Sequence, residues 1–138
     1  MSRIHTADVK SRIESLALLA SKTFVTLVPS GSTVSAPWAV IHPSNGTDTQ
    51  SRFTGPKLTQ HPSFTLHLVG TTADQVGWML EQVKAKFITG GFGIRPTITG
   101  ENTGPYEWSQ PIPIQYDSDV SPALIYAVVE LDLYTEPA

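Results

Sequence analysis

The chain has 138 residues, of which 40% are hydrophobic and 15% are charged, and it contains no cysteine. A chain of this length has the size of one domain and buries enough surface to fold without a metal ion, and the lack of cysteine excludes disulfide scaffolds, thiol nucleophiles and cysteine-ligated zinc sites. The net charge of −3 argues against general nucleic-acid binding. A charged fraction below the usual ~25% fits either a surface that a partner partly covers or a neutral solvated surface rich in Ser and Thr.

The charges are divided unevenly along the chain. Residues 1–100 hold nine Lys and Arg against five Asp and Glu, a net of +4, whereas residues 101–138 hold seven acids and no Lys or Arg, a net of −7. An acidic segment of this kind is typical of a solvated face, and it also suits a surface that repels a polyanion. The first residues are too polar for a signal peptide, and no apolar run approaches the ~20 residues of a membrane span. We therefore expect a protein of a cytoplasm, or of a particle assembled there, with no membrane partner.

The first expected element is a helix over residues 6–20, with Thr6 as its N-cap and Asp8 in the first turn. Two strands rich in β-branched side chains follow at residues 24–28 and 38–42, and Pro43 closes the second. The spacing of four, three and four residues predicts one buried stripe on the helix, which consists of Val9, Ile13, Leu16 and Ala20.

Residues 43–62 form a long polar segment without a clear pattern of secondary structure. Loops of this length are uncommon in a compact domain and are usually functional or disordered. We therefore predict an extended arm or long hairpin that orders against a neighbouring molecule. Its candidate contact residues are Asp48, Arg52, Phe53, Lys57 and Leu58.

A half-buried strand and a capped helix come next. Phe64, Leu66 and Leu68 alternate with polar residues over residues 63–69, which predicts one buried face. Thr72 and Gln75 match a capping box at the start of a helix that runs to about residue 88. The predicted apolar stripe of this helix is Val76, Leu80, Val83 and Phe87, with Met79 alongside, and Gly90 and Gly91 are predicted to stop the helix.

The last third is predicted to hold three further strands. The first lies at residues 94–98, a loop spans residues 99–111, and short alternation predicts a strand at 112–116. In the loop, Tyr106 and Trp108 are candidates for exposed anchors at a protein–protein interface, where aromatic residues are enriched. The strongest strand is predicted at residues 124–133, with one apolar face made of Ile125, Ala127, Val129, Leu131 and Leu133.

This order of elements predicts an α+β fold in a single domain of residues 1–138. A mostly antiparallel sheet of about five to six strands carries two packed helices, and the long loop or hairpin arm extends from it. The candidate chemistry is sparse. Four scattered histidines do not make a zinc pattern, and the chain has no Gly-x-Ser-x-Gly motif. Asp117 and Asp119 fit either paired carboxylates for acid–base work or cation binding, or a turn between two strands.

The whole pattern resembles the tail terminator (tail completion) proteins of long-tailed, siphovirus-type bacteriophages. The resemblance covers nearly the full length and is carried by four features in order. An N-terminal helix leads into a strand, and residues 37–43 (Pro-Trp-Ala-Val-Ile-His-Pro) lead into a polar loop. Residues 64–70 (Phe-Thr-Leu-His-Leu-Val-Gly) run into the helix that starts at 72–76, and a turn with Asp117 precedes the final strand at 126–131.

The resemblance implies a structural virion protein without catalysis or cofactor. Proteins of this family form a homo-hexameric ring at the head-proximal end of the tail tube, where they end tube polymerisation and meet the head–tail connector protein. DNA passes through the lumen without specific binding, and a basic lining would retain its phosphates. The candidate acidic lumen surface of this chain is Asp117, Asp119, Glu130 and Asp132.

Two other functions stay open at the level of sequence. One is a head–tail connector of the stopper or adaptor kind, which shares a small α+β architecture. The other is a small ligand-binding domain or enzyme, which requires a polar pocket with a convergent acid–base pair.

Overall fold

The structure, a computed structural model of the chain, describes residues 2–26, 37–44, 59–117 and 124–137. In this part of the chain, two α-helices and a short 3₁₀ helix accompany ten strands. The elements in chain order are α1 (Ser2–Glu14), the 3₁₀ helix η1 (Ala17–Leu19), β1 (Thr23–Val25), β2 (Trp38–Ser44), β3 (Ser63–Gly70), α2 (Ala73–Phe87), β4 (Ile88–Thr89), β5 (Phe92–Gly93), β6 (Glu101–Thr103), β7 (Glu107–Ser109), β8 (Gln115–Asp117), β9 (Leu124–Asp132) and β10 (Thr135–Pro137).

Six strands form the largest sheet, in the order β1-β2-β3-β9-β7, and β8 pairs with the other end of β9. β1 runs parallel to β2, and the remaining pairings of this sheet are antiparallel. The two strands with the most regular alternation, β3 and β9, lie next to each other and pair along their length, from Ser63 opposite Asp132 to Gly70 opposite Ile125. These observations confirm the predicted α+β fold with a mostly antiparallel sheet.

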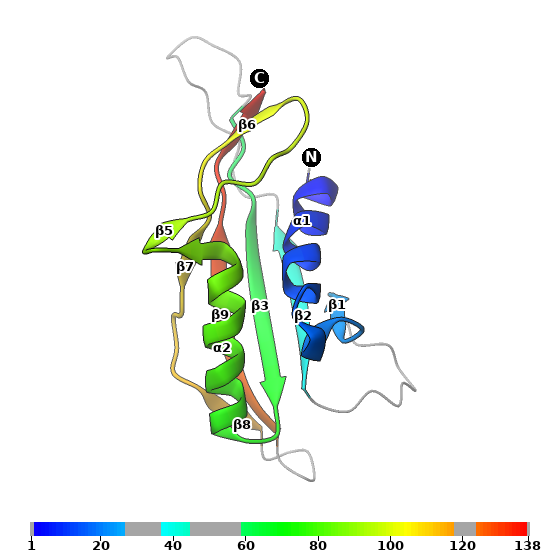
Figure 1. The fold of residues 1–138 in the computed structure, drawn as a ribbon, viewed down its shortest axis with the longest axis vertical. Helices are drawn as coiled ribbons and strands as arrows, with labels where there is room; N and C mark the ends of the chain where they lie inside the picture. The colour runs from blue at the N-terminus through cyan, green and yellow to red at the C-terminus, as the bar shows by residue number, and fades with distance from the viewer. Residues whose placement is uncertain (1, 27–36, 45–58, 118–123, 138) are drawn as a thin grey trace.

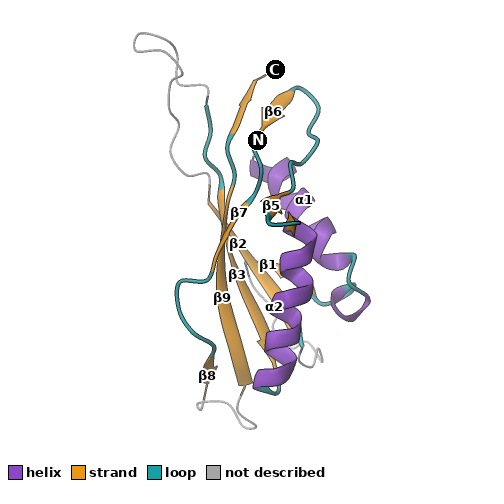
Figure 2. Cartoon of the chain, turned by 60° about the vertical axis from the view of Figure 1, so that its left-hand side comes forward, coloured by secondary structure: helices purple, strands orange, loops and turns teal. Residues whose placement is uncertain are grey.

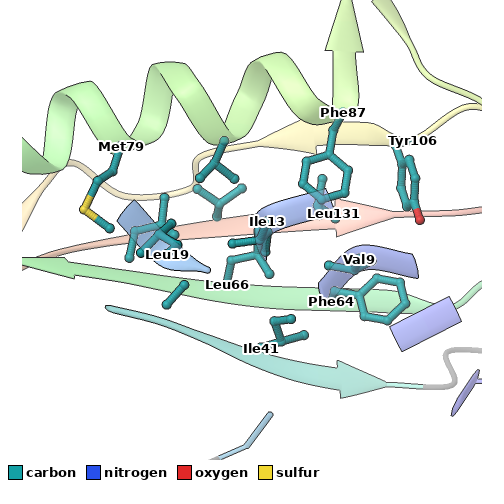
Figure 3. Packing of buried hydrophobic residues seen from close by; sticks show 14 of the residues in the cluster. Val9, Ile13, Leu19, Ile41, Phe64, Leu66, Met79, Phe87, Tyr106 and Leu131 are labelled. Carbon is teal, nitrogen blue, oxygen red and sulfur yellow. The ribbon is translucent and has the colours of Figure 1, made fainter. Parts of the chain in front are cut away.

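Both helices lie on the same face of the sheet (Figures 1 and 2). α1 contacts β1 and β2, and α2 contacts β3 and β9. The core fills the space between the helices and the sheet, and Figure 3 shows its side chains in close contact. Its buried members are Val9, Ile13, Leu19, Ala39, Ile41, Phe64, Leu66, Leu68, Met79, Val83, Phe87, Tyr106, Val129, Leu131 and Leu133.

The first helix begins and ends earlier than predicted. α1 spans Ser2–Glu14, so Thr6 lies inside the helix and is not its N-cap. Leu16 interrupts the helical path with extended backbone angles of φ −81° and ψ 125°. The chain then re-enters a helical turn that buries Leu19, whereas Ala20 of the predicted stripe is exposed. Because leucine removes more apolar area from water than alanine, the break brings the more stabilising side chain into the core.

The second helix and its cap match the prediction closely. The backbone N–H of Gln75 donates to Thr72 Oγ1 at 3.1 Å, and the N–H of Thr71 donates to Gln75 Oε1 at 2.8 Å. The Gln75 side chain therefore reaches one residue further back than a standard capping box requires. On the buried side Met79 is fully covered, whereas Leu80 is only partly so.

Gly90 and Gly91 do not stop α2, contrary to the prediction. The helix ends at Phe87, and Ile88 is already extended with φ −124° and ψ 123°. The two glycines instead form the turn of the β4–β5 hairpin, with φ values of 62° and 84°. Positive φ at both turn positions is the requirement of a type I′ hairpin turn, which glycine meets without steric cost.

Residues 94–111 also differ from the prediction. Residues 94–98 are not a strand, and β6 and β7 both lie within the predicted loop of residues 99–111. β7 pairs with the end of β9, and β6 pairs with β10 to form a ribbon that continues past the large sheet (Figure 1). These three-residue strands depend on partners far along the chain, and they are too short to show a period of their own.

The remaining strands adjust the predicted boundaries. The predicted strand at 112–116 is β8, shifted to Gln115–Asp117, and β2 continues through Pro43 to Ser44. Pro43 lies beyond the part of β2 that pairs with β1, where β2 is an edge strand and tolerates the missing N–H. Neither helix in the described ranges has the length and apolar character of a membrane span.

Candidate functional site

The face of the sheet opposite the helices is one candidate surface. Along β3, Phe64, Leu66 and Leu68 point into the core, and the residues between them point to the opposite face and are half-buried. No described helix lies over that face, as Figure 2 shows. We call it the open face.

One end of the open face is acidic. Glu130 and Asp132 of β9 are both exposed, and the strand register places Glu107 of β7 directly opposite Asp132. On the other side, Thr65 and Ser63 of β3 lie opposite the same two acids. The strands in the described ranges contain no Lys or Arg, so no cation of these strands offsets the three carboxylates.

The arrangement of these carboxylates works against stability. Like charges that face each other directly across an antiparallel pair are destabilising. Glu107 and Asp132 face each other in this way. The pair does not stabilise the fold, and it fits either a solvated acidic face or a surface that repels a polyanion.

The rest of the open face is apolar and aromatic. The rings of His42, His67 and Tyr126 form a diagonal row across β2, β3 and β9, with centroids 4.9 Å apart for the first pair and 6.5 Å for the second. The row starts at the acidic end, because His42 pairs with Thr65, which pairs with Glu130. Burial lowers the pKa of His67, and the neighbouring His42 lowers it further. His67 is therefore neutral at neutral pH. Half-buried apolar side chains lie along the same strands: Trp38, Val69, Leu124 and Val128.

The predicted acidic lumen surface is brought together only in part. Glu130 and Asp132 lie on the open face, and Glu107, which the sequence did not single out, joins them. Asp117 is in β8 opposite Leu124, and its side chain is outside the described part of the structure. Asp119 lies outside the described residues altogether. The same is true of all five predicted arm residues: Asp48, Arg52, Phe53, Lys57 and Leu58.

The prediction of an interface loop is wrong, because these residues include a strand. The prediction that Tyr106 is an exposed anchor is also wrong. Tyr106 is 1% exposed, and its hydroxyl donates to Asp8 Oδ2 at 2.5 Å. Its ring meets that of Phe87 edge-on at 5.0 Å. Trp108 belongs to β7, where it is half-buried, and its ring centroid lies 6.2 Å from that of Phe87. The polar tip of Tyr106 has a partner inside the molecule, so the whole side chain can be buried.

Asp8 joins three elements at this point. It accepts from Tyr106 and from Arg12 Nε, the latter at 2.8 Å, and Arg12 Nη1 donates to the backbone oxygen of Lys86 at 3.3 Å. Burial is the main cause that raises the pKa of Tyr106 above its usual range, and the hydrogen bond to Asp8 adds to it. This network connects α1, α2 and the start of β7, and its role is structural.

A second buried polar contact ties α1 to the β6–β10 ribbon. His5 is fully buried, its Nε2 lies 3.2 Å from Glu101 Oε1, and Thr135 Oγ1 donates to the same oxygen at 3.0 Å. Burial lowers the pKa of His5, against the opposing effect of Glu101. His5 Nδ1 is buried and has no hydrogen-bond partner. Sequence analysis missed this contact, because its three residues lie far apart in the chain.

Phe92 is the most exposed large apolar side chain of the described part of the chain, at 80%. The only sequence signal for it is the run Gly-Gly-Phe-Gly at residues 90–93, whose first two glycines were predicted to stop the preceding helix. Within the described ranges, no three His, Asp or Glu side chains gather closely enough to hold a metal ion.

Comparison of the chain with protein-family models and with curated proteins gave no match.

Proposed function

We propose that this protein is a ring-forming structural protein of a bacteriophage virion. In this proposal it closes the head-proximal end of the tail tube as a homo-hexamer, ends tube polymerisation and offers the surface to which the head–tail connector binds. The observation that carries the proposal is the open face, a sheet surface that no described helix covers and whose acidic end has no cation on its strands.

The acidic end of the open face suits the wall of a channel for DNA. DNA carries a negative charge about every 1.7 Å of its axis, and cations on a channel wall would bind it strongly. Glu107, Glu130 and Asp132 repel phosphates instead. In a ring, symmetry repeats this patch once per subunit, so the repulsion surrounds the channel. A wall of this kind lets DNA slide without being held.

Tail morphology tests the proposal most directly. Deleting the gene from a phage that encodes this protein should give tails of abnormal, excessive length in negative-stain electron microscopy, and supplying the gene in trans should restore their length. Tails of normal length that fail to join heads would instead identify a head–tail connector. Intact, infectious particles without the protein would rule out both roles.

Native mass spectrometry across a concentration series adds a second, independent test. A closed hexamer of the purified protein supports the ring. A mixture of open-ended oligomers without a preferred size contradicts a closed ring, because a heterologous interface that does not close builds filaments.

A further inference from the structure

The β4–β5 hairpin presents an exposed aromatic side chain on a tight support. Phe92 follows the two-residue turn of Gly90 and Gly91 and is 80% exposed. The side chain of Phe92 therefore projects from the molecule rather than packing on it. Buried aromatic anchors of this size carry much of the binding free energy at protein interfaces.

The hairpin is held firmly to the core. The N–H of Ile94 donates to the oxygen of Phe87 at 2.6 Å, and the N–H of Tyr106 donates to the oxygen of Ile94 at 3.0 Å. Gly93 packs so closely that a Cβ at this position would lie 2.0 Å from the oxygen of Tyr106. Because the support of Phe92 is already ordered, binding through Phe92 costs little conformational entropy.

A hollow of about 370 Å³ lies on the other margin of the molecule. Val25 of β1, Pro43 of β2 and Ala7 of α1 give it apolar walls, and Val25 is 38% exposed. Arg3 and Lys10 of α1 also line it, together with Thr6. The hollow thus combines apolar surface with Arg3 and with Lys10, whose Nζ lies 3.6 Å from Glu14 Oε1.

The exposed Phe92 and the hollow lie at opposite margins of the sheet. β1 is at one end of the strand order and β7 at the other, and Gly93 of the hairpin touches Pro105 and Tyr106 just before β7. Figure 1 shows β5 on the left of the sheet and α1 with β1 on the right. A closed ring with one subunit type needs two different, complementary surfaces on opposite sides of each subunit.

We propose that Phe92 of one copy inserts into the hollow formed by Arg3, Ala7, Lys10, Val25 and Pro43 of the next copy. This head-to-tail contact rests on the proposed ring function and identifies the surfaces that build the ring. Both contact surfaces lie at the margins of the sheet. Neighbouring copies therefore leave the open face uncovered, and this face is perpendicular to the radius of the ring.

Disulfide trapping tests the contact in the full chain, which has no cysteine of its own. The variant with both F92C and A7C should form a ladder of trimers and larger species under mild oxidation, and reductant should collapse it to monomers. Single F92C and A7C variants should stop at dimers. The control pair F92C with E81C, which places the second thiol on the exposed side of α2, should not build the ladder. A doubly substituted protein that gives no more than the control pair overturns the proposal.

Native mass spectrometry of F92S separates this proposal from the ring itself. We expect the subunit concentration for half-assembly to rise about thirty-fold, the change for a strong interface residue. An unchanged circular dichroism spectrum and unfolding midpoint would show that F92S still folds. Hexamers of F92S at the wild-type concentration would overturn the contact and leave the ring in place. A phage that builds tails of normal length without this protein would overturn the ring function instead.

Discussion

The two faces of the large sheet follow the same alternation of side chains, but they differ in what lies over them. On the covered face, α2 packs on β3 and β9, and the alternating residues of these strands are buried from Phe64 to Leu68 and from Ala127 to Leu131. On the open face, the intervening residues are half-buried or exposed and include three carboxylates. The comparison separates side chains that hold the fold from side chains that are available to a partner. Substitutions on the covered face should therefore change stability, and those at the acidic end of the open face should change DNA passage.

The largest difference in the free energy of unfolding is expected between variants of two neighbouring β3 residues that point to opposite faces. Leu66 is fully buried, and Leu66→Ala should lower the free energy of unfolding by about 2–5 kcal/mol, because it leaves a cavity in the core. Thr65→Ala on the open face should change it by less than about 1 kcal/mol. Urea unfolding of both variants measures the difference. Equal losses would show that the open face is also covered in the folded monomer.

A somewhat smaller loss of stability is expected in the hydrogen-bond network of Asp8, Arg12 and Tyr106. Tyr106→Phe removes the hydroxyl that donates to Asp8, and loss of a hydrogen bond to a charged group should cost about 1.5–3 kcal/mol. Tyr116→Phe is the matched control, since Tyr116 is 66% exposed and should lose almost nothing. Thermal and chemical unfolding of the two variants provide the measurement. Equal stability of Y106F and wild type would show that the hydrogen bond from Tyr106 to Asp8 does not stabilise the fold.

The buried His5 predicts a dependence of stability on pH. Burial lowers its pKa in the folded state below the ordinary value of 6.5, so the unfolded chain binds the proton more readily. The contribution of neutral His5 to the free energy of unfolding is present above about pH 6.5, and it is lost as the pH falls towards the folded-state pKa of His5. His67 is shifted in the same direction and adds to the effect.

Unfolding midpoints between about pH 7.5 and about pH 5 measure this loss. His5→Gln should flatten the profile, and His67→Gln should flatten it less, since His5 is fully buried and His67 only half-buried. A wild-type profile that is level over this range would contradict a neutral, buried His5.

The smallest change in stability is expected from the acidic end of the open face. The triple variant E107Q/E130Q/D132N removes charges that face each other across β7 and β9. We expect its free energy of unfolding to rise by about 0.2–1 kcal/mol, and the gain should shrink at high salt. The proposed hexamer should persist in this variant, and the retention of double-stranded DNA in a filter-binding assay should increase. Loss of the hexamer would show that these carboxylates belong to the subunit interface.

Several elements of the fold could be predicted because their information is local. The alternation of Phe64, Leu66 and Leu68 identifies β3 and its buried face without any knowledge of the partner strand. Thr72 and Gln75 likewise mark the start of α2, because the cap is made by residues three apart. Each of these long or capped elements buries one face, so the apolar period of the sequence is strong.

Other elements depended on contacts that only the tertiary structure supplies. β6, β7 and β10 are three residues long, and each exists because a distant strand lies beside it. Tyr106 is an aromatic residue of the kind found at interfaces, but it is buried, since Asp8, 98 positions earlier in the chain, accepts a hydrogen bond from its hydroxyl.

Some features of the candidate surfaces could likewise be predicted from the sequence, and others could not. The sequence alone determined that Glu130 and Asp132 lie on the polar side of a strand, because side chains alternate with a period of two. Only the tertiary structure placed Glu107 opposite Asp132, exposed Phe92 beyond the glycine turn and set it across the sheet from the hollow beside α1. The physical reason is that a periodic pattern records which face of an element is buried, whereas strand register and the packing of distant segments decide which surfaces come together.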